Sequence, residues 1–303
     1  MTPSFVIAVF KKYGEDHGGY QAALLTYYGF LSLFPLLLVL VTVLQLWFHN
    51  DPVVRQQVST SVGHFFPQIG SDLQTQIRGL RRVGLGLAVG IIVTLYGARG
   101  AADAFRFSLD NMWQIPKNKR AGFPKSMLLS LAIMSAGAAG FAATAAVSSF
   151  TASLGHTWES KALANFLGFV ILSGVLGYMF RIATRGRIRY RYMLLGASIA
   201  ALIMQLLLSF GGILVAHELR NLDSLYGTFA VVLGLLFWLY IMAQVVLLAA
   251  EIDTVRHFAL WPRALAGKQT DADRHAYKLY AQSEKYIEKE YIGITFGHNH
   301  KKE

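Results

Sequence analysis

The chain has 303 residues, of which 54% are hydrophobic and only 15% are charged. Soluble domains carry about 25% charged residues, so this composition excludes a disordered chain and an ordinary soluble enzyme. The absence of cysteine excludes disulfides, a cysteine nucleophile and a thiolate metal site, and the net charge of +11 must be explained by where the basic residues lie.

The first predicted element is a short amphipathic helix on the membrane surface. Its apolar positions are Phe5, Val6, Val9, Phe10 and Tyr13.

Six stretches without Asp, Glu, Lys or Arg follow it. A spanning helix needs about 20 mainly apolar residues, so they predict six transmembrane helices, at about 22–48, 83–104, 127–150, 162–181, 192–215 and 226–250. If both termini are cytoplasmic, 22 of the 28 Lys and Arg residues lie on inner segments. The positive-inside rule therefore predicts a multi-pass protein of the bacterial plasma membrane with both termini inside. Topology and anionic lipid headgroups account for the charge, and no nucleic-acid partner is expected.

The predicted fold class is thus an all-α polytopic membrane protein with interfacial helices. Residues 1–258 form the six-helix membrane domain, in which the outer segment 49–82 lies over the outer face. Residues 259–303 form a cytoplasmic tail with a disordered end. One amphipathic helix is predicted in this tail from a stripe of Ala276, Tyr280, Ser283, Ile287 and Tyr291.

A charge ladder is the first candidate site. Arg99, Asp103, Arg106 and Asp110 are spaced by four, three and four residues, which puts alternating charges on one helix face. The ladder is either a gate or binding site for a charged headgroup, or a salt-bridged extension of the second helix. A position within the membrane would favour the functional interpretation.

Two further candidates lie in the first and sixth predicted helices. Glu251, with Gln244 on the same face, is either a proton-coupling site or the partner of an arginine in the 181–191 loop. Pro35, which follows Tyr27 and Tyr28, predicts a kinked or broken helix. Such a helix either lines a transport path or is a static kink.

The inner loop between the fourth and fifth helices is basic, and it is expected to contact anionic lipid headgroups through Arg181, Arg185, Arg187, Arg189 and Arg191. Motifs of hydrolases, metalloproteases and nucleotide-binding enzymes are missing, and the histidines are scattered. We therefore expect no catalytic residue, no cofactor and no metal site, and a protein that is not an enzyme.

Three sequence blocks resemble the YihY/BrkB family of bacterial inner-membrane proteins, over about residues 5–258. They run from Ala22 to Leu38, from Arg99 to Lys125, and from Tyr226 to Ile252. The block with Tyr27-Tyr28 and Ser32-Leu33-Phe34-Pro35 is the most specific. Thr26, where a small apolar residue is usual, and Asp253, where Asn is usual, depart from the family pattern.

The resemblance implies a membrane protein of a family once labelled ribonuclease BN. Its members are linked to serum resistance, and its YhjD branch is described as transporting a lipid or lipid A precursor. Tyr28, Pro35, Arg99 and Glu251 match the family pattern, which assigns no role to them.

Three functional hypotheses follow. The first is a transporter or flippase-like protein for a lipid or amphiphilic anion, with anionic membrane lipids as partners. The second is a scaffold for envelope assembly whose tail binds a cytoplasmic partner; deletion of 263–303 should abolish its function but largely spare a transporter. The third and least favoured is a membrane-bound ribonuclease. A homo-oligomer is left open.

Overall fold

A computed structural model describes residues 3–47, 85–153, 158–184, 188–209, 228–265 and 268–296 of the chain. The outer segment 49–82, Arg185, Arg187 and the last residues, 297–303, were part of the predictions above and lie outside this description. The described residues form helices and connecting turns. The all-α prediction is therefore confirmed for these parts of the chain.

Seven labelled helices are described. They are α1 (Pro3–Glu15), α2 (Gly18–Trp47), α5 (Leu85–Met112), α6 (Lys125–Ser153), α7 (Trp158–Ala183), α9 (Thr228–His257) and α10 (Asp271–Ser283). An eighth helical stretch, Leu194–Ser209, lies between α7 and α9. Two short 3-10 turns, η1 (Lys117–Lys119) and η2 (Tyr190–Tyr192), connect longer elements.

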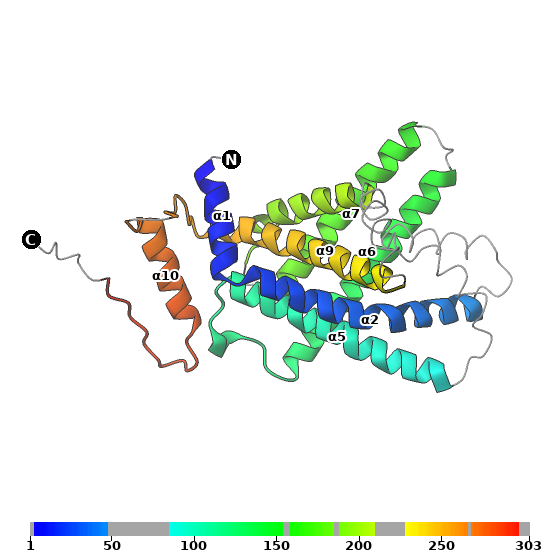
Figure 1. The fold of residues 1–303 in the computed structure, drawn as a ribbon, viewed down its shortest axis with the longest axis horizontal. Coiled ribbons are helices and arrows are strands. Elements are labelled where there is room, and N and C mark those ends of the chain that lie inside the picture. Colours follow the sequence, from blue (N-terminus) through cyan, green and yellow to red (C-terminus); the bar gives the residue numbers. More distant parts are fainter. Residues whose placement is uncertain are drawn as a thin grey trace, which may run out of the picture.

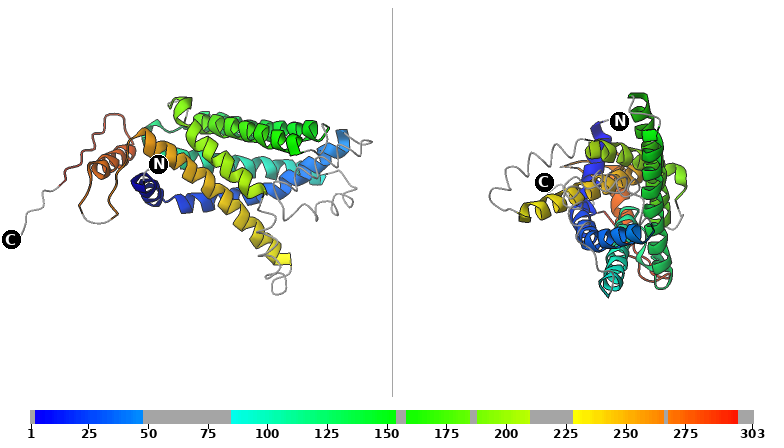
Figure 2. Two further views of the ribbon diagram at one scale, coloured as in Figure 1. Left: turned by 90° about the horizontal axis from the view of Figure 1, so that it is seen from above. Right: turned by 90° about the vertical axis from the view of Figure 1, so that its right-hand side faces the viewer.

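The long helices form a bundle in which α2 packs mainly on α5 and α9, and α6 packs on α7 (Figure 1). The helices α1 and α10 lie at one end of this bundle, which we call the polar end. α1 runs across the bundle axis and contacts the last turns of α9 (Figures 1 and 2). The first and last described helices of the chain thus cover the same end of the bundle.

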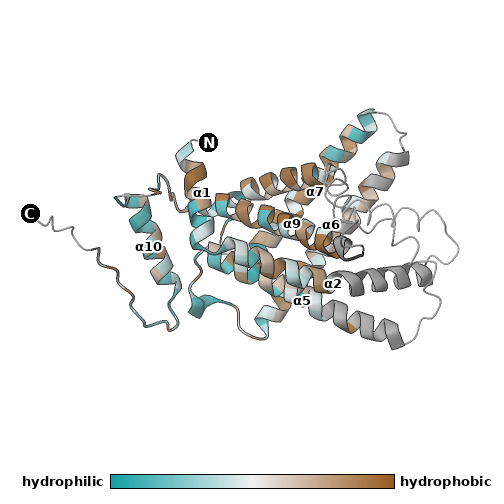
Figure 3. Ribbon diagram, viewed as in Figure 1, coloured by the Kyte–Doolittle hydropathy of each residue, from teal (hydrophilic) through white to brown (hydrophobic). Residues whose placement is uncertain are grey.

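Within the described residues, three helical stretches are long and apolar enough to cross a membrane: Lys125–Val147, Trp158–Ala183 and Val232–His257. The apolar colouring of α7 and α9 contrasts with the polar surface of α10 (Figure 3). The other three predicted spans coincide with α2, α5 and the shorter apolar helix Leu194–Ser209. A helical membrane protein is therefore supported, while the number six remains a prediction.

The first predicted span is not broken at its proline. α2 runs without interruption from Gly18 to Trp47 and so passes through Pro35. A proline removes only one backbone hydrogen bond of a helix, and a long helix can continue past it when its neighbours satisfy the carbonyl groups. The expectation of a broken helix at this position is therefore wrong, while the alternative of a kink at Pro35 stays a prediction.

The predicted stripe in the tail is shorter than expected. Ala276 and Ser283 are buried on α10, but the helix ends at Ser283, so Ile287 and Tyr291 lie beyond it and are exposed. The start of α10 is well defined, because Thr270 and Asp273 form a reciprocal capping box there.

Close packing of the Leu194–Ser209 helix on α9 depends on Gly196. A Cβ atom at this position would lie 2.2 Å from the Ala249 carbonyl oxygen and 2.4 Å from Asp253 Oδ2. The Gly196 amide also donates a 2.8 Å hydrogen bond to Asp253 Oδ1. Asp253, which departs from the family pattern, therefore caps the first turn of the neighbouring helix.

We expect Gly196→Ala to destabilise the protein by about 1–3 kcal/mol, because backbone atoms of α9 would have to move. Gly174→Ala in α7 is the matched control, since a Cβ atom there meets nothing within 4 Å. That substitution should be neutral or stabilising by up to about 1 kcal/mol. Thermal unfolding in detergent, followed by tryptophan fluorescence, measures both, and equal midpoints would contradict the packing argument.

Candidate functional site

Several predicted residues line one hollow between α2 and α5, which we call the Arg99 hollow. Its volume is about 440 Å³, and its lining includes Leu24, Tyr28, Tyr96, Arg99, Asp103 and Phe107. Two sequence blocks that are far apart, the Tyr27-Tyr28 segment and the charge ladder, therefore meet in space. They meet because Gly100 lets α2 approach α5: a Cβ atom there would lie 2.3 Å from the Tyr28 ring.

In the hollow, Asp103 interacts more closely with Ser130 and Arg106 than with Arg99. Asp103 accepts a 2.6 Å hydrogen bond from Ser130 Oγ and lies 3.3 Å from Arg106 Nη2. Its contact with Arg99 is longer, at 3.5 Å from Asp103 Oδ2 to Arg99 Nε. The Arg99 side chain is 49% exposed, and in the described parts of the chain Asp103 is its one polar partner. Its terminal N–H groups are therefore available to an anion.

The aromatic rings of Tyr28, Tyr96 and Phe107 line the Arg99 hollow. The rings of Tyr27 and Tyr28 are 5.2 Å apart in an edge-to-face arrangement, and Tyr27 is exposed. Tyr96 is 70% exposed, and Phe107 is also exposed. The site thus offers a cationic group with a neighbouring apolar and aromatic surface, which suits a molecule with an anionic head and an apolar body.

The predicted ladder holds in part. Arg99, Asp103 and Arg106 interact as the spacing predicts. Asp110 is buried instead, at 3% exposure, and its carbonyl oxygen accepts a 2.9 Å hydrogen bond from the Ile115 amide. Asp110 therefore does not share the partly exposed position of Arg99 and Asp103.

Glu251 pairs with a residue that the sequence analysis did not single out. Lys12 of α1 is fully buried, and its Nζ lies 2.9 Å from Glu251 Oε2 and also contacts Asp16. Its third interaction is a 2.8 Å hydrogen bond to the Met112 carbonyl at the end of α5. The suggested partner for Glu251, an arginine of the 181–191 loop, is therefore replaced by Lys12.

Lys12 lies on the buried stripe of α1. Phe5, Ala8, Val9 and Lys12 are buried, whereas Val6 and Phe10 are exposed. Of the positions predicted to form the apolar face, Phe5 and Val9 are buried, but Val6 and Phe10 are not. The spacing of three, one and three residues was a visible signal that Lys12 faces the interior.

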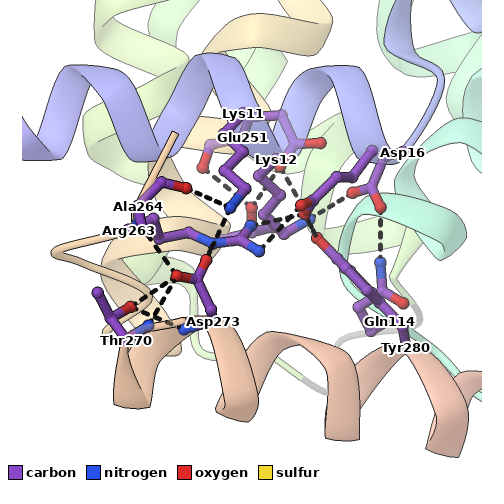
Figure 4. Close-up of polar contacts among 12 residues, drawn as sticks. Lys11, Lys12, Asp16, Gln114, Glu251, Arg263, Ala264, Thr270, Asp273 and Tyr280 are labelled. Carbon is purple, nitrogen blue, oxygen red and sulfur yellow. Dashed lines mark hydrogen bonds and ion pairs between the residues drawn. The ribbon is translucent and has the colours of Figure 1, made fainter. Parts of the chain in front are cut away.

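A second polar cluster joins α1 to the tail. Arg263 donates two hydrogen bonds to Glu15, at 2.6 and 3.0 Å, and one of 2.9 Å to Asp273. Lys11 lies 2.9 Å from the same oxygen of Asp273, and Tyr280 donates a 2.7 Å hydrogen bond to Glu15. Figure 4 shows Lys11, Arg263, Asp273 and Tyr280 between α1 and α10. The tail is therefore fixed to the first helix by charged groups.

The charged groups of α1 and α10 have shifted pKa values. Burial alone would lower the pKa of Lys12, but the charges of Glu251 and Asp16 outweigh it, so the pKa is raised. Burial alone would raise the pKa of Asp273, but hydrogen bonds from Lys11, the Thr270 and Ala264 amides and Arg263 hold it well below the usual range. Lys12 and Asp273 are thus both charged at neutral pH.

A second hollow lies at the corner between α1 and α2, and we call it the corner hollow. Its volume is about 450 Å³, and Tyr13, His17, Gly18, Tyr20 and Tyr240 are among its lining residues. Burial raises the pKa of Tyr13 to about 12, and the charges of Tyr240 and Glu251 add to this effect. The Tyr13 hydroxyl is therefore protonated at neutral pH and lies close enough to Glu251 to be affected by its charge.

Other predicted site residues lie apart from both hollows. Gln244 is partly buried on α9. Arg181 is exposed in the last turn of α7. Arg189 and Arg191 are exposed around η2, where Arg191 donates a 2.7 Å hydrogen bond to Tyr192. In the described residues, no group of three or more His, Cys, Asp and Glu side chains could hold a metal ion.

The sequence profile of the family called Virulence factor BrkB matches residues 9–272 of this chain. Similar proteins include a UPF0761 membrane protein of Vibrio vulnificus (strain YJ016), 24% identical over 82% of this chain and 81% of that protein. A UPF0761 membrane protein of Psychromonas ingrahamii is 23% identical over 83% of this chain and 87% of its own length. A UPF0761 membrane protein of Saccharophagus degradans is 25% identical over 79% of this chain and 56% of its own length. No solved structure matches.

Proposed function

This chain belongs to the BrkB family of membrane proteins, and from this premise we propose that it binds an amphiphilic anion in the Arg99 hollow and moves it across the bacterial plasma membrane. The anion is a lipid or lipid-like molecule with a phosphate or carboxylate head. The observation that supports this most is the half-exposed Arg99 guanidinium beside exposed aromatic rings. A guanidinium can bind phosphate through two parallel hydrogen bonds.

The position of Arg99 along its helix adds to the argument. α5 has 28 residues, which corresponds to about 42 Å, and Arg99 is about 20 Å from its end at Met112. A hydrocarbon core is about 30 Å thick, so a spanning α5 carries Arg99 within or near the membrane. A charged residue at such a depth is costly and usually functional. This favours the binding site over the alternative of a salt-bridged helix extension.

The proposal includes the predicted topology. Six membrane-spanning helices with both termini in the cytoplasm would put the polar end, with α1 and α10, on the cytoplasmic side. Arg181, Arg189 and Arg191 would then face anionic headgroups of the inner leaflet. The Arg99 hollow would open toward lipid from this side of the membrane.

Transport of fluorescent phosphatidylglycerol in proteoliposomes tests the proposal. We expect faster movement between leaflets than in protein-free vesicles, and a loss of about tenfold or more in Arg99→Gln, because a charge-assisted hydrogen bond contributes about 1.5–3 kcal/mol. Arg274→Gln on the exposed surface of α10 is the control and should keep the wild-type rate. Equal rates in Arg99→Gln and wild type, or no movement of anionic, zwitterionic or single-chain lipids, would contradict the proposal.

The scaffold hypothesis keeps one supporting observation, the exposed side chains of Tyr286, Ile287 and Tyr291 after α10. Deletion of 263–303 does not distinguish the two functions, because it would also remove Arg263 and its contacts with α1. Truncation after Lys285 removes Tyr286, Ile287 and Tyr291 and leaves the Arg263 contacts in place. A scaffold that binds through the end of the tail should lose its partner on this truncation, while a transporter should keep its rate.

A further inference from the structure

The buried charges around Lys12 do not balance. Its ammonium group contacts one oxygen of Asp16 and one of Glu251, so one positive charge serves two carboxyl groups. The three side chains are 0%, 6% and 0% exposed. If both carboxyl groups are ionised, this buried group carries one excess negative charge, which is costly in a site with little access to water.

The neighbouring cluster shows that this imbalance is particular to the Lys12 group. There, Lys11 and Arg263 supply two positive charges, and Glu15 and Asp273 supply two negative charges. The two clusters contain adjacent residues at the end of α1, Lys11 in one and Lys12 in the other. Of the two, the one that contains Glu251 has more acidic than basic groups.

The hydrogen bonds of this group leave one carboxyl oxygen, Glu251 Oε1, without a donor in the described residues. An ammonium group has three donors, and Lys12 uses them on Asp16, Glu251 and the Met112 carbonyl. Glu251 Oε2 also accepts a 2.8 Å hydrogen bond from Thr254. Glu251 Oε1 is buried and has no donor in the parts of the chain that the structure describes. The carboxyl group of Glu251 thus belongs to the cluster that lacks a positive charge, and its Oε1 atom also lacks a hydrogen-bond donor.

We propose that Glu251 is a proton-binding site, which takes up one proton on Oε1 from the polar end through the corner hollow. The proton forms an O–H bond, the carboxylate becomes a neutral carboxylic acid, and no other bond changes. One ammonium then faces one carboxylate, that of Asp16, and the buried group is neutral. Release of the proton restores the excess negative charge beside Lys12.

The corner hollow provides the route. Tyr13 and Tyr240 line it, and the Tyr13 hydroxyl is a buried group without a partner in the described residues. In the described residues, the titratable groups around Glu251 are Lys12 and Tyr13 from α1, Asp16 from the turn after it, and Tyr240 from α9. α5 contributes the Met112 carbonyl, and the nearby Tyr280 of α10 is bound to Glu15.

A coupling to transport rests on the proposed function above. Lys12 is the charged link between α1 and α9, and the net charge of its group changes by one unit when Glu251 gains or loses a proton. Movement of the helices at the polar end would therefore respond to a proton gradient. An anion that enters the Arg99 hollow would then be transported at a rate that depends on this gradient.

Infrared spectroscopy of the full chain in lipid nanodiscs, with glutamate labelled with ¹³C at the side-chain carboxyl, tests the proton site. At about pH 7 we expect an absorption band of a protonated glutamic acid, which is lost in Glu251→Gln. This variant has the shape of the protonated acid and should fold. Glu159→Gln, at an exposed position of α7, is the control and should keep the band. Absence of the band in the wild type, or its survival in Glu251→Gln, would overturn the site.

Two further measurements test the route and the coupling. In Tyr13→Phe, transfer to deuterated water should shift the band more slowly than in the wild type, and an equal rate would overturn the route. In proteoliposomes, an imposed pH gradient should change the wild-type transport rate but not that of Glu251→Gln. A wild-type transport rate that does not change with the pH gradient would overturn the coupling but not the proton site. Absence of any lipid movement would overturn the proposed function and the coupling, while the infrared result still decides the proton site.

Discussion

Replacement of Lys12 by methionine should destabilise the protein by about 3–5 kcal/mol, because Lys12 is, among the described residues, the one positive charge that contacts Asp16 and Glu251. Both carboxyl groups would stay buried, and the Met112 carbonyl would lose its donor. Thermal unfolding of the purified protein in detergent, followed by tryptophan fluorescence, measures the effect.

The double variant Lys12→Met, Asp16→Asn separates the charge from the packing. It should recover part of the loss, because the second substitution removes a buried carboxyl group that the first one left unpaired. Lys125→Met at the exposed start of α6 is the control and should unfold like the wild type. If Lys12→Met and Lys125→Met unfold at the same temperature, the buried charge group does not stabilise the polar end.

Replacement of Asp273 by asparagine should release α10 from α1. Asp273 is buried and accepts hydrogen bonds from Lys11, Arg263, the Ala264 amide and both the amide and the hydroxyl of Thr270. Loss of its charge leaves Arg263 with the carboxylate of Glu15 alone and removes the carboxylate that Lys11 contacts, at a cost of up to about 3–5 kcal/mol to the attachment of the tail. Hydrogen exchange of the α10 amides should accelerate accordingly. Asp271→Asn in the same turn is exposed, and it should change exchange by far less.

The same attachment should depend on pH. The folded state holds the pKa of Asp273 below the value of about 3.9 in an unfolded chain. The stabilisation is therefore complete above about pH 4 and is lost as the pH falls from that value toward the folded pKa. Exchange of the α10 amides, corrected for the intrinsic effect of pH, should rise below about pH 4 in the wild type. A flat profile would show that Asp273 does not hold the tail.

The helices were largely predictable, because runs of apolar residues between charges mark them in the sequence. The predicted ranges 127–150 and 162–181 lie within α6 and α7. Pro35 did not break its helix, since one proline is a local signal, whereas the continuity of a helix also depends on its neighbours. In the tail, Ile287 and Tyr291 continued the apolar spacing of α10 although the helix ends at Ser283.

The site was predictable only as separate parts. Tyr28 and Arg99 were each recognised, but their meeting depends on the close approach of two helices at Gly100, which spacing along one helix does not reveal. The partner of Glu251 was missed for the same reason, because Lys12 is near the start of the chain and Glu251 near its end. Thr270 and Asp273 did carry a local signal, the spacing of a capping box.

The joining of α1 to α9 and α10 also sets an order of events during biosynthesis. The ribosome makes Lys11, Lys12 and Glu15 first, whereas Glu251, Arg263 and Asp273 emerge only after the last apolar helix. Until then, the charged and apolar groups of α1 have none of these partners. The polar end can therefore close only on a chain that has been completed. A product of interrupted translation would keep this end open and remain accessible to proteases that remove unfinished membrane proteins.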